Sequence, residues 1–244
     1  MKKVLLVLLF SISVSNDYVH SSNEAFNNLL FSYVDSVGNV NYQGIIDSPF
    51  SFNEYFSFIE KISPVNHPEY FKSQNDEKAY WINVYNALII KLMIDNPNKN
   101  ILDISIFGVF IFSKKFKVGG QMISPNHIEH KILRKMNDPR IHFAINCASK
   151  SCPPLGNRIL IGKNIEKQLN EKAISFINDI DNVYISHEEE TIYLNKIFKW
   201  FKKDFKNVIQ FITEFLIEDI DYDRIKNYKI KYYKYDWSSN QLSN

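Results

Sequence analysis

Cysteine, glycine and proline are scarce in this chain: its 244 residues include 2 cysteines, 7 glycines and 8 prolines. Two cysteines allow at most one disulfide within the chain. So few glycines and prolines exclude a long disordered linker, and the sequence contains no internal repeat and no low-complexity tract. With 45% hydrophobic and 15% aromatic residues, the composition is instead that of a globular domain with a full core.

An excess of charge of one sign is also missing. The formal net charge is +2, and Lys2 and Lys3 at the N-terminus account for it. The rest of the chain is therefore close to neutral, which gives no electrostatic reason for binding nucleic acid or an anionic membrane surface. We expect neither as a partner, and the sequence predicts no cofactor.

A long apolar run is the third absence. Residues 4–14 are apolar apart from two serines, and Asn16 and Asp17 end the run. A helix that spans a membrane needs about 20 apolar residues, so this run is too short. Two lysines before it and the small residues Ser13 and Ser15 near its end are typical of a secretory signal peptide.

We therefore predict that residues 1–15 are a cleaved signal peptide and that residues 16–244 form one periplasmic or secreted domain without an integral membrane segment. The mature chain is expected to begin near Asn16. Intact-mass measurement of the secreted or periplasmic fraction tests this prediction. A cytoplasmic pool that retains Met1 would contradict it.

The hydrophobic pattern predicts an α+β domain. Its strongest helical segment, Asp76 to Ile94, is apolar on nearly every side, which is typical of a helix buried in the core. We expect this central helix to pack against a mostly antiparallel sheet. Further helices are expected at residues 23–37, 52–62, 125–135, 165–178 and 205–218, and strands at residues 107–112, 116–118, 141–148, 183–194 and 228–235.

Several segments of the chain resemble a known family. They are Ala79 to Ala87 (AYWINVYNA), Ile128 to Arg134 (IEHKILR), Asp138 to Leu155 (DPRIHFAINCASKSCPPL), Lys196 to Phe205 and Tyr235 to Ser238. In this order they are similar to the family called domain of unknown function 547, and the last two resemble its bacterial members. The resemblance covers about residues 25–240. It implies a place in the exported bacterial branch of that family, but no particular activity.

The most specific segment contains both cysteines. A strand at residues 141–148 places Cys147 on its apolar face, directly before the polar turn of residues 148–151. A thiolate nucleophile needs hydrogen-bond donors and positive charge nearby, which the turn amides and Lys150 would supply. A second interpretation is structural, because Cys147 and Cys152 are candidates for a disulfide in an oxidising compartment. A third is that both are inert thiols.

The helix expected at residues 125–135 has a carboxylate on its apolar face. Glu129 lies within that face and His130 at its margin. A buried carboxylate is costly unless it is paired or protonated. Glu129 therefore either pairs with Arg140 or His142 as a structural ion pair, or acts with His130 beside the cysteine nucleophile. The histidines lack the spacing of a metal site, so no metal is predicted.

Two carboxamides, Asn83 and Asn86, lie on the buried helix and must find hydrogen-bond partners there. One interpretation is that they hold loops to the core. The other is that they bind substrate together with His142.

Two functional hypotheses follow. In the first, the protein is a thiol-dependent hydrolase or transferase acting on an amide or thioester, with Cys147 as nucleophile, His130 as base and Glu129 as orienting carboxylate. In the second, it is a non-catalytic exported binding or structural module with a Cys147–Cys152 disulfide. An α+β domain with a buried helix loosely resembles the papain and transglutaminase class. Those enzymes carry their cysteine at the start of that helix, where this chain has asparagines.

Overall fold

The computed structural model describes the backbone of residues 2–104 and 111–242, and the side chains from residue 17 onwards within those ranges. Its helices are α1 (Lys2–Tyr33), α2 (Tyr42–Asp47), α3 (Phe50–Lys61), α4 (Gln74–Ile94), α5 (Pro125–His127), α6 (Ile165–Ile177), α7 (Lys196–Trp200), α8 (Lys202–Phe205), α9 (Val208–Thr213) and α10 (Tyr222–Ile225). Its strands are β1 (Phe116–Val118), β2 (Gln121–Ile123), β3 (Val183–Ser186), β4 (Thr191–Leu194) and β5 (Lys229–Tyr232). No helix in these residues combines the length and the apolar character that a bilayer span requires.

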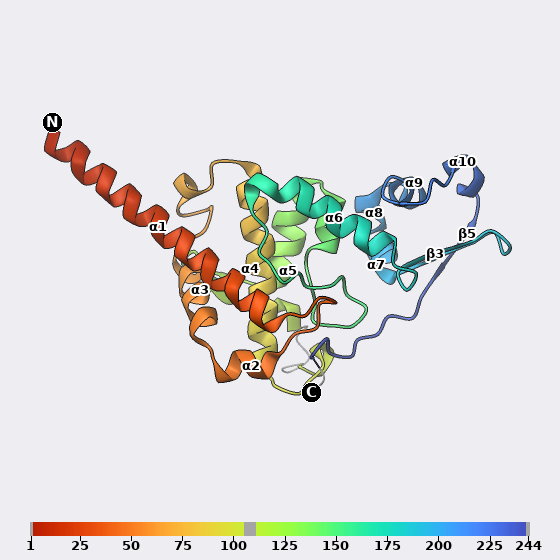
Figure 1. Ribbon diagram of the computed structural model, residues 1–244, viewed down its shortest axis with the longest axis horizontal. Coiled ribbons are helices and arrows are strands. Elements are labelled where there is room, and N and C mark those ends of the chain that lie inside the picture. The colour runs from red at the N-terminus through yellow and green to blue at the C-terminus, as the bar shows by residue number, and fades with distance from the viewer. Residues whose placement is uncertain (1, 105–110, 243–244) are drawn as a thin grey trace.

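The longer helices gather around α4, and the sheet of β3, β4 and β5 extends from one end of this helical body (Figure 1). β1 pairs with β2 and β3 with β4 in antiparallel fashion, while β5 runs parallel to β4. This architecture confirms the prediction of a single α+β domain. The hairpin predicted at residues 183–194 is confirmed as β3 and β4.

Helix α4 is the buried central helix that the sequence predicts. The Ser73 side chain caps its first turn by accepting a hydrogen bond from the backbone N–H of Asp76. Side chains all around its axis are buried, from Trp81 and Ile82 to Leu88. Most of its packing contacts are with α2, α5, α6 and short helical turns, so its immediate surroundings are helical rather than a broad sheet.

The prediction of a strand at residues 141–148 is wrong. Pro139–Phe143 is a 3₁₀ helix, capped by the Asp138 side chain, which accepts a hydrogen bond from the backbone N–H of Arg140. The alternating pattern is misleading here because neighbouring residues of this segment, including His142 and Phe143, are all buried. Burial on every side removes the physical difference between the two faces that an alternating pattern implies.

Two predicted helices are interrupted. Residues 125–136 contain α5, a π-helical turn at Ile128–Ile132 and a 3₁₀ turn at Leu133–Met136. The helix predicted at residues 205–218 is broken at Lys206, which has a φ of 57°, before Asn207 caps α9. Of the strand predicted at residues 107–112, residues 107–110 lie outside the described residues, and Ile111–Ser113 is a 3₁₀ turn.

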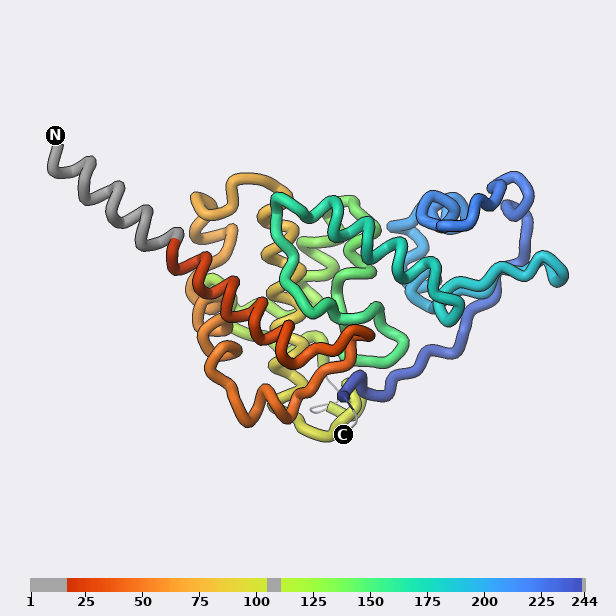
Figure 2. Tube along the Cα trace, in the orientation of Figure 1, coloured from red at the N-terminus to blue at the C-terminus, as the bar shows by residue number. Residues whose placement is uncertain are grey.

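After β5 the C-terminal segment, residues 233–242, returns across the molecule to the helical body (Figure 2). It runs beside the segment that contains both cysteines, residues 138–155, which we call the cysteine segment. The backbone N–H groups of Lys150 and Ser151 donate to the carbonyls of Ser238 and Asp236. The N–H of Asn240 donates to the carbonyl of Ala148. Residues far apart in sequence thus meet around the two cysteines.

Candidate functional site

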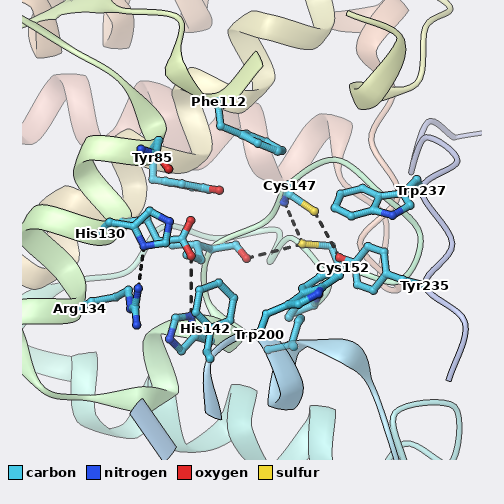
Figure 3. Close-up of a pocket in the computed structure, with 16 residues that line it drawn as sticks. Tyr85, Phe112, His130, Arg134, His142, Cys147, Cys152, Trp200, Tyr235 and Trp237 are labelled. Atoms are coloured by element: carbon cyan, nitrogen blue, oxygen red, sulfur yellow. Dashed lines mark hydrogen bonds and ion pairs between the residues drawn. The ribbon is translucent and has the colours of Figure 1, made fainter. Parts of the chain in front are cut away.

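The cysteine segment opens onto a cavity of about 480 Å³, a size typical of ligand pockets (Figure 3). Helix α4, the π-helical turn, the cysteine segment, α7 and the C-terminal segment all contribute to its walls. The lining residues are Tyr85, Phe112, Asn126, Glu129, His130, Arg134, His142, Ile145, Cys147, Cys152, Pro153, Ile197, Trp200, Phe201, Tyr235 and Trp237. The cavity therefore contains five of the residues singled out from the sequence: Cys147, Cys152, Glu129, His130 and His142.

The Cys147 thiol is surrounded by hydrogen-bonding groups. Ser149 Oγ lies 3.0 Å and Tyr235 Oη 3.4 Å from its Sγ atom. Burial alone would raise the pKa of Cys147. Hydrogen bonds with Cys152, the Ser149 hydroxyl and amide, and Tyr235 outweigh it and bring this pKa below its usual value.

Cys147 and Cys152 are both free thiols in the structure. The backbone N–H of Cys147 donates to Cys152 Sγ over 2.9 Å. Burial and the charge of Cys147 hold the pKa of Cys152 well above its usual value. The two sulfur atoms are thus unequal, and Cys147 is the one that ionises first. A disulfide between them stays a prediction from the sequence.

The amides of the turn after Cys147 are already engaged. Ala148 N–H donates to Asn146 Oδ1, and Cys152 N–H to the Ser149 carbonyl. The amides of residues 150 and 151 bind the C-terminal segment, as described above. The turn therefore has no free pair of backbone amides to bind a substrate oxyanion, contrary to the expectation from the sequence. Lys150, which was expected to supply positive charge to the thiolate, is exposed and does not line the cavity.

Glu129 lies in the π-helical turn, and both Glu129 and the next residue, His130, line the cavity. The Glu129 side chain is only 13% exposed. Burial raises its pKa to about 7, with smaller contributions from negative charge on Cys147 and Asp204, while Arg134 opposes the rise. A carboxyl with a pKa near neutrality is suited to accept and donate protons.

Of the two structural pairs suggested for Glu129, the one with Arg140 does not form, and the one with His142 is a long contact that is an ion pair only when the ring is charged. Arg140 binds Asp138 and Glu166 instead. His142 Nδ1 lies 4.0 Å from Glu129 Oε1, beyond hydrogen-bond distance, and is a buried atom without a hydrogen-bond partner among the described residues.

The other nitrogen of His142 determines how its ring is protonated. His142 Nε2 lies 2.8 Å from Asp204 Oδ2. Although burial opposes it, hydrogen bonds from Arg134 and His142 keep the pKa of Asp204 below its usual value, so this carboxylate accepts the Nε2 proton. Burial lowers the pKa of His142 to about 4. The neutral ring therefore presents a bare Nδ1 lone pair to Glu129.

Arg134 connects this pair to His130. It donates to both oxygens of Asp204, over 2.6 and 2.7 Å, and its third donor lies 2.8 Å from His130 Nδ1. Burial, followed by the charge of Arg134, lowers the pKa of His130. Since Arg134 can only donate, His130 Nδ1 must accept, and the ring proton is on Nε2. His130 is thus a hydrogen-bond donor at its remaining nitrogen.

Asn83 and Asn86 do not line this cavity; they hold backbone groups. Asn83 bonds the carbonyl and N–H of Leu160, at 2.8 and 3.0 Å. Asn86 donates to the Ala144 carbonyl over 3.0 Å and accepts from the Asn146 N–H over 2.9 Å. Of the three residues predicted to bind substrate, only His142 reaches the cavity.

We predict that Asn86→Ala destabilises the fold by roughly 2–4 kcal/mol, because it leaves the buried Ala144 carbonyl and Asn146 N–H without partners. Urea unfolding measures the change. An unchanged unfolding midpoint together with weaker substrate binding would instead assign Asn86 to the site.

Sequence reasoning missed Arg134, Asp204 and Tyr235 as site residues. Each stands in a segment that carries the family resemblance, so the signal was present. Their roles were hidden because Asp204 and Tyr235 are 70 and 101 residues from Arg134 in the chain, and only folding brings them together.

Comparison with known proteins bears on the segment that contains the catalytic candidates. Residues 70–177 match the family described as "Protein of unknown function, DUF547". The chain is similar to DUF547 over this segment. The matched residues include Glu129, His130, His142 and both cysteines, while Asp204 and Tyr235 lie outside the DUF547 match. No curated protein and no solved structure matches the chain, so the likeness to papain and transglutaminase folds stays a prediction.

Proposed function

We propose that this protein is a cysteine-dependent hydrolase or transferase acting on an amide or thioester, with Cys147 as the nucleophile and Glu129 as the proton acceptor. The observation that carries the proposal is that both groups line one cavity and that negative charge on Cys147 raises the pKa of Glu129. The lowered pKa of the thiol and the raised pKa of the carboxyl bring the two proton affinities together. Transfer of the thiol proton to Glu129 then costs little free energy.

The hydrogen bonds favour a different division of roles from the one expected from the sequence. His130 has no free lone pair while Arg134 donates to its Nδ1 atom, so it is suited to donate from Nε2 rather than to act as base. Glu129, which was expected to orient His130, is the better base. His142 faces Glu129 with a lone pair and is suited to hold the carboxyl once it is protonated.

Tyr85 is suited to stabilise the oxyanion. Its side chain lines the cavity, and its hydroxyl points toward Cys147 in Figure 3. Burial, together with negative charge on Glu129 and Cys147, holds the pKa of Tyr85 well above its usual value, so the hydroxyl keeps its proton. A protonated phenol donates a hydrogen bond to a developing oxyanion, the role that the engaged turn amides cannot take.

The reaction proceeds in two balanced steps. Cys147 Sγ forms a bond to the carbonyl carbon while its proton passes to Glu129, and the bond to the leaving group breaks as Glu129 returns that proton to it. Water or a second nucleophile then attacks the acyl-enzyme and gives its proton to Glu129. Release of the acyl group returns the electron pair to sulfur, and Glu129 reprotonates the thiolate.

The proposed cellular setting is the periplasm or the outside of the cell, in the exported bacterial branch of the DUF547 family. This part of the proposal is supported by the N-terminal sequence and by the bacterial character of residues 196–205 and 235–238.

Acylation by p-nitrophenyl acetate tests the proposed chemistry. We expect a burst of nitrophenol and, by peptide mapping, an acetyl group on Cys147 alone. Cys147→Ala is expected to abolish both. Cys152→Ser is expected to keep the acylation, because the serine oxygen can accept the same hydrogen bond from the Cys147 N–H.

The alternative, a non-catalytic module with a Cys147–Cys152 disulfide, makes the opposite prediction. Iodoacetamide would then label neither cysteine until the protein is reduced. Reduced protein whose Cys147 resists both reagents would contradict the proposal.

A further inference from the structure

Three aromatic side chains form a wall beside Cys147. Trp200 ends α7, and Tyr235 and Trp237 come from the C-terminal segment. Their ring centroids lie 4.7 Å (Trp200–Tyr235), 4.6 Å (Tyr235–Trp237) and 5.6 Å (Trp200–Trp237) apart. We call these three residues the aromatic wall. Trp200 is 45% exposed, so part of its ring is available to a ligand.

The aromatic wall lies on one side of the nucleophile. In Figure 3 the rings of Tyr235 and Trp237 lie on the side of the cysteines opposite to Tyr85, His130 and Arg134, and Trp200 lies below the cysteines. Tyr235 Oη lies within hydrogen-bond distance of Cys147 Sγ, at 3.4 Å, so the aromatic wall directly adjoins the reacting atom. A substrate whose carbonyl carbon contacts Cys147 therefore has one half on the aromatic wall and the other half near the polar side chains.

The chemistry of the two sides decides which half goes where. The leaving group must receive a proton from Glu129, so it lies on the polar side and the acyl group lies on the aromatic wall. The hydroxyl of Tyr235 is already engaged with Cys147 and Ser149, and Pro153 and Ile197 add further apolar surface to the cavity. A flat apolar group stacks on such a surface without needing polar partners, whereas the hydroxyls of a sugar would need them.

We infer that the substrate carries an aryl-containing acyl group that stacks on the aromatic wall, with its leaving group toward Glu129. The inference rests on the proposed function for the direction of the substrate. The stacking itself is a binding property, and it can be measured without any reaction.

Binding to the full chain with Cys147→Ala is therefore the test. Calorimetry compares phenylacetamide with cyclohexylacetamide, which has the same number of non-hydrogen atoms but no aromatic face. Phenylacetamide is expected to bind about two- to tenfold more tightly, the gain of one stacked aromatic pair. Adding Trp200→Ala should remove this preference and adding Trp200→Phe should keep it. Tyr184→Ala, at an exposed site outside the cavity, is the matched control and should leave the preference unchanged.

Equal affinity for the two amides, no binding of either, or binding of methyl glucoside in their place would overturn the inference. Those results would leave the acylation of Cys147 by p-nitrophenyl acetate as it is. Conversely, phenylacetamide binding that depends on Trp200, in a protein that no ester acylates, would retain the aryl site and remove the proposed reaction. The two failures are therefore distinguishable.

Discussion

Glu129→Gln is expected to slow acylation of Cys147 by an unactivated amide by roughly 10²–10⁴-fold, because glutamine cannot give a proton to the amine leaving group. Alkylation of Cys147 by iodoacetamide should not fall with it. The negative charges of Glu129 and of the Cys147 thiolate disfavour each other, so removal of the carboxylate favours the thiolate. Stopped-flow acylation and timed alkylation of the same variant separate the two effects.

The same substitution is expected to stabilise the fold at high pH. The pKa of Glu129 is raised from 4.5 to about 7 in the folded protein. Since the folded state holds this proton more tightly than the unfolded state, the free energy of unfolding of the wild type falls as the pH rises from about 4.5 to about 7. Glutamine carries no such penalty, so Glu129→Gln gains up to about 3 kcal/mol above pH 7 and nothing below about pH 4.

Urea unfolding at both ends of this pH range tests the second effect. Glu171→Gln is the matched control, since the Glu171 side chain is 61% exposed and lies outside the cavity. A Glu129→Gln protein that is less stable than the wild type at both pH values and acylates normally would assign Glu129 to a structural ion pair. A gain in stability with a loss of acylation is the result expected for a functional residue.

Asp138→Ala is expected to destabilise the fold by roughly 3–5 kcal/mol near pH 7, because it leaves the buried Lys78 ammonium with only the exposed Glu166 carboxylate, 3.8 Å away. Lys78 Nζ lies 2.8 Å from Asp138 Oδ2, and both side chains are less than a tenth exposed. Arg140 donates to both oxygens of the same carboxylate over 2.8 Å. Asp138 also caps the 3₁₀ helix that carries His142, so its loss should loosen the site as well.

The pH dependence of this loss has a defined sign. Although burial opposes it, hydrogen bonds from Arg140 and Lys78 hold the pKa of Asp138 below its usual value of 3.8. The stability that Asp138 contributes is therefore present above pH 3.8 and lost as the pH falls through its folded pKa. Wild type and Asp138→Ala should accordingly converge in strongly acidic urea titrations.

Glu166→Gln provides the control within the same network. Glu166 pairs with Arg140 over 2.6 Å and with Lys78 over 3.8 Å, but its side chain is 55% exposed. Solvent screening limits such a pair to about 1 kcal/mol or less. If Asp138→Ala and Glu166→Gln lowered the free energy of unfolding equally, burial would not be the reason that the Lys78–Asp138 pair stabilises the fold.

Local sequence patterns were enough to predict some elements of the fold. Helix α4 and the β3–β4 hairpin were expected from the sequence, because a long segment that is apolar on nearly every side and two short strand-like segments joined by a turn each indicate one structure. The cysteine segment was not, because residues 141–148 are almost completely buried and too few for length to tell a strand from a helix, whereas the length of α4 does so. Asp138 and Pro139 start a 3₁₀ helix there. In the sequence this cap and proline are a less visible signal than the alternation of apolar and polar residues, so the alternation was misread as a strand.

The sequence by itself determined the composition of a globular α+β domain, the buried central helix, the similarity to DUF547 and the choice of Cys147, Glu129 and His130 as site candidates. Only the tertiary structure decided their protonation and therefore their roles. Arg134 occupies the lone pair of His130, Asp204 holds the Nε2 proton of His142, and burial in the cavity brings the pKa of Glu129 near neutrality. Protonation depends on charge, burial and hydrogen-bond direction within a few ångströms, and these neighbours are distant in the chain until it folds.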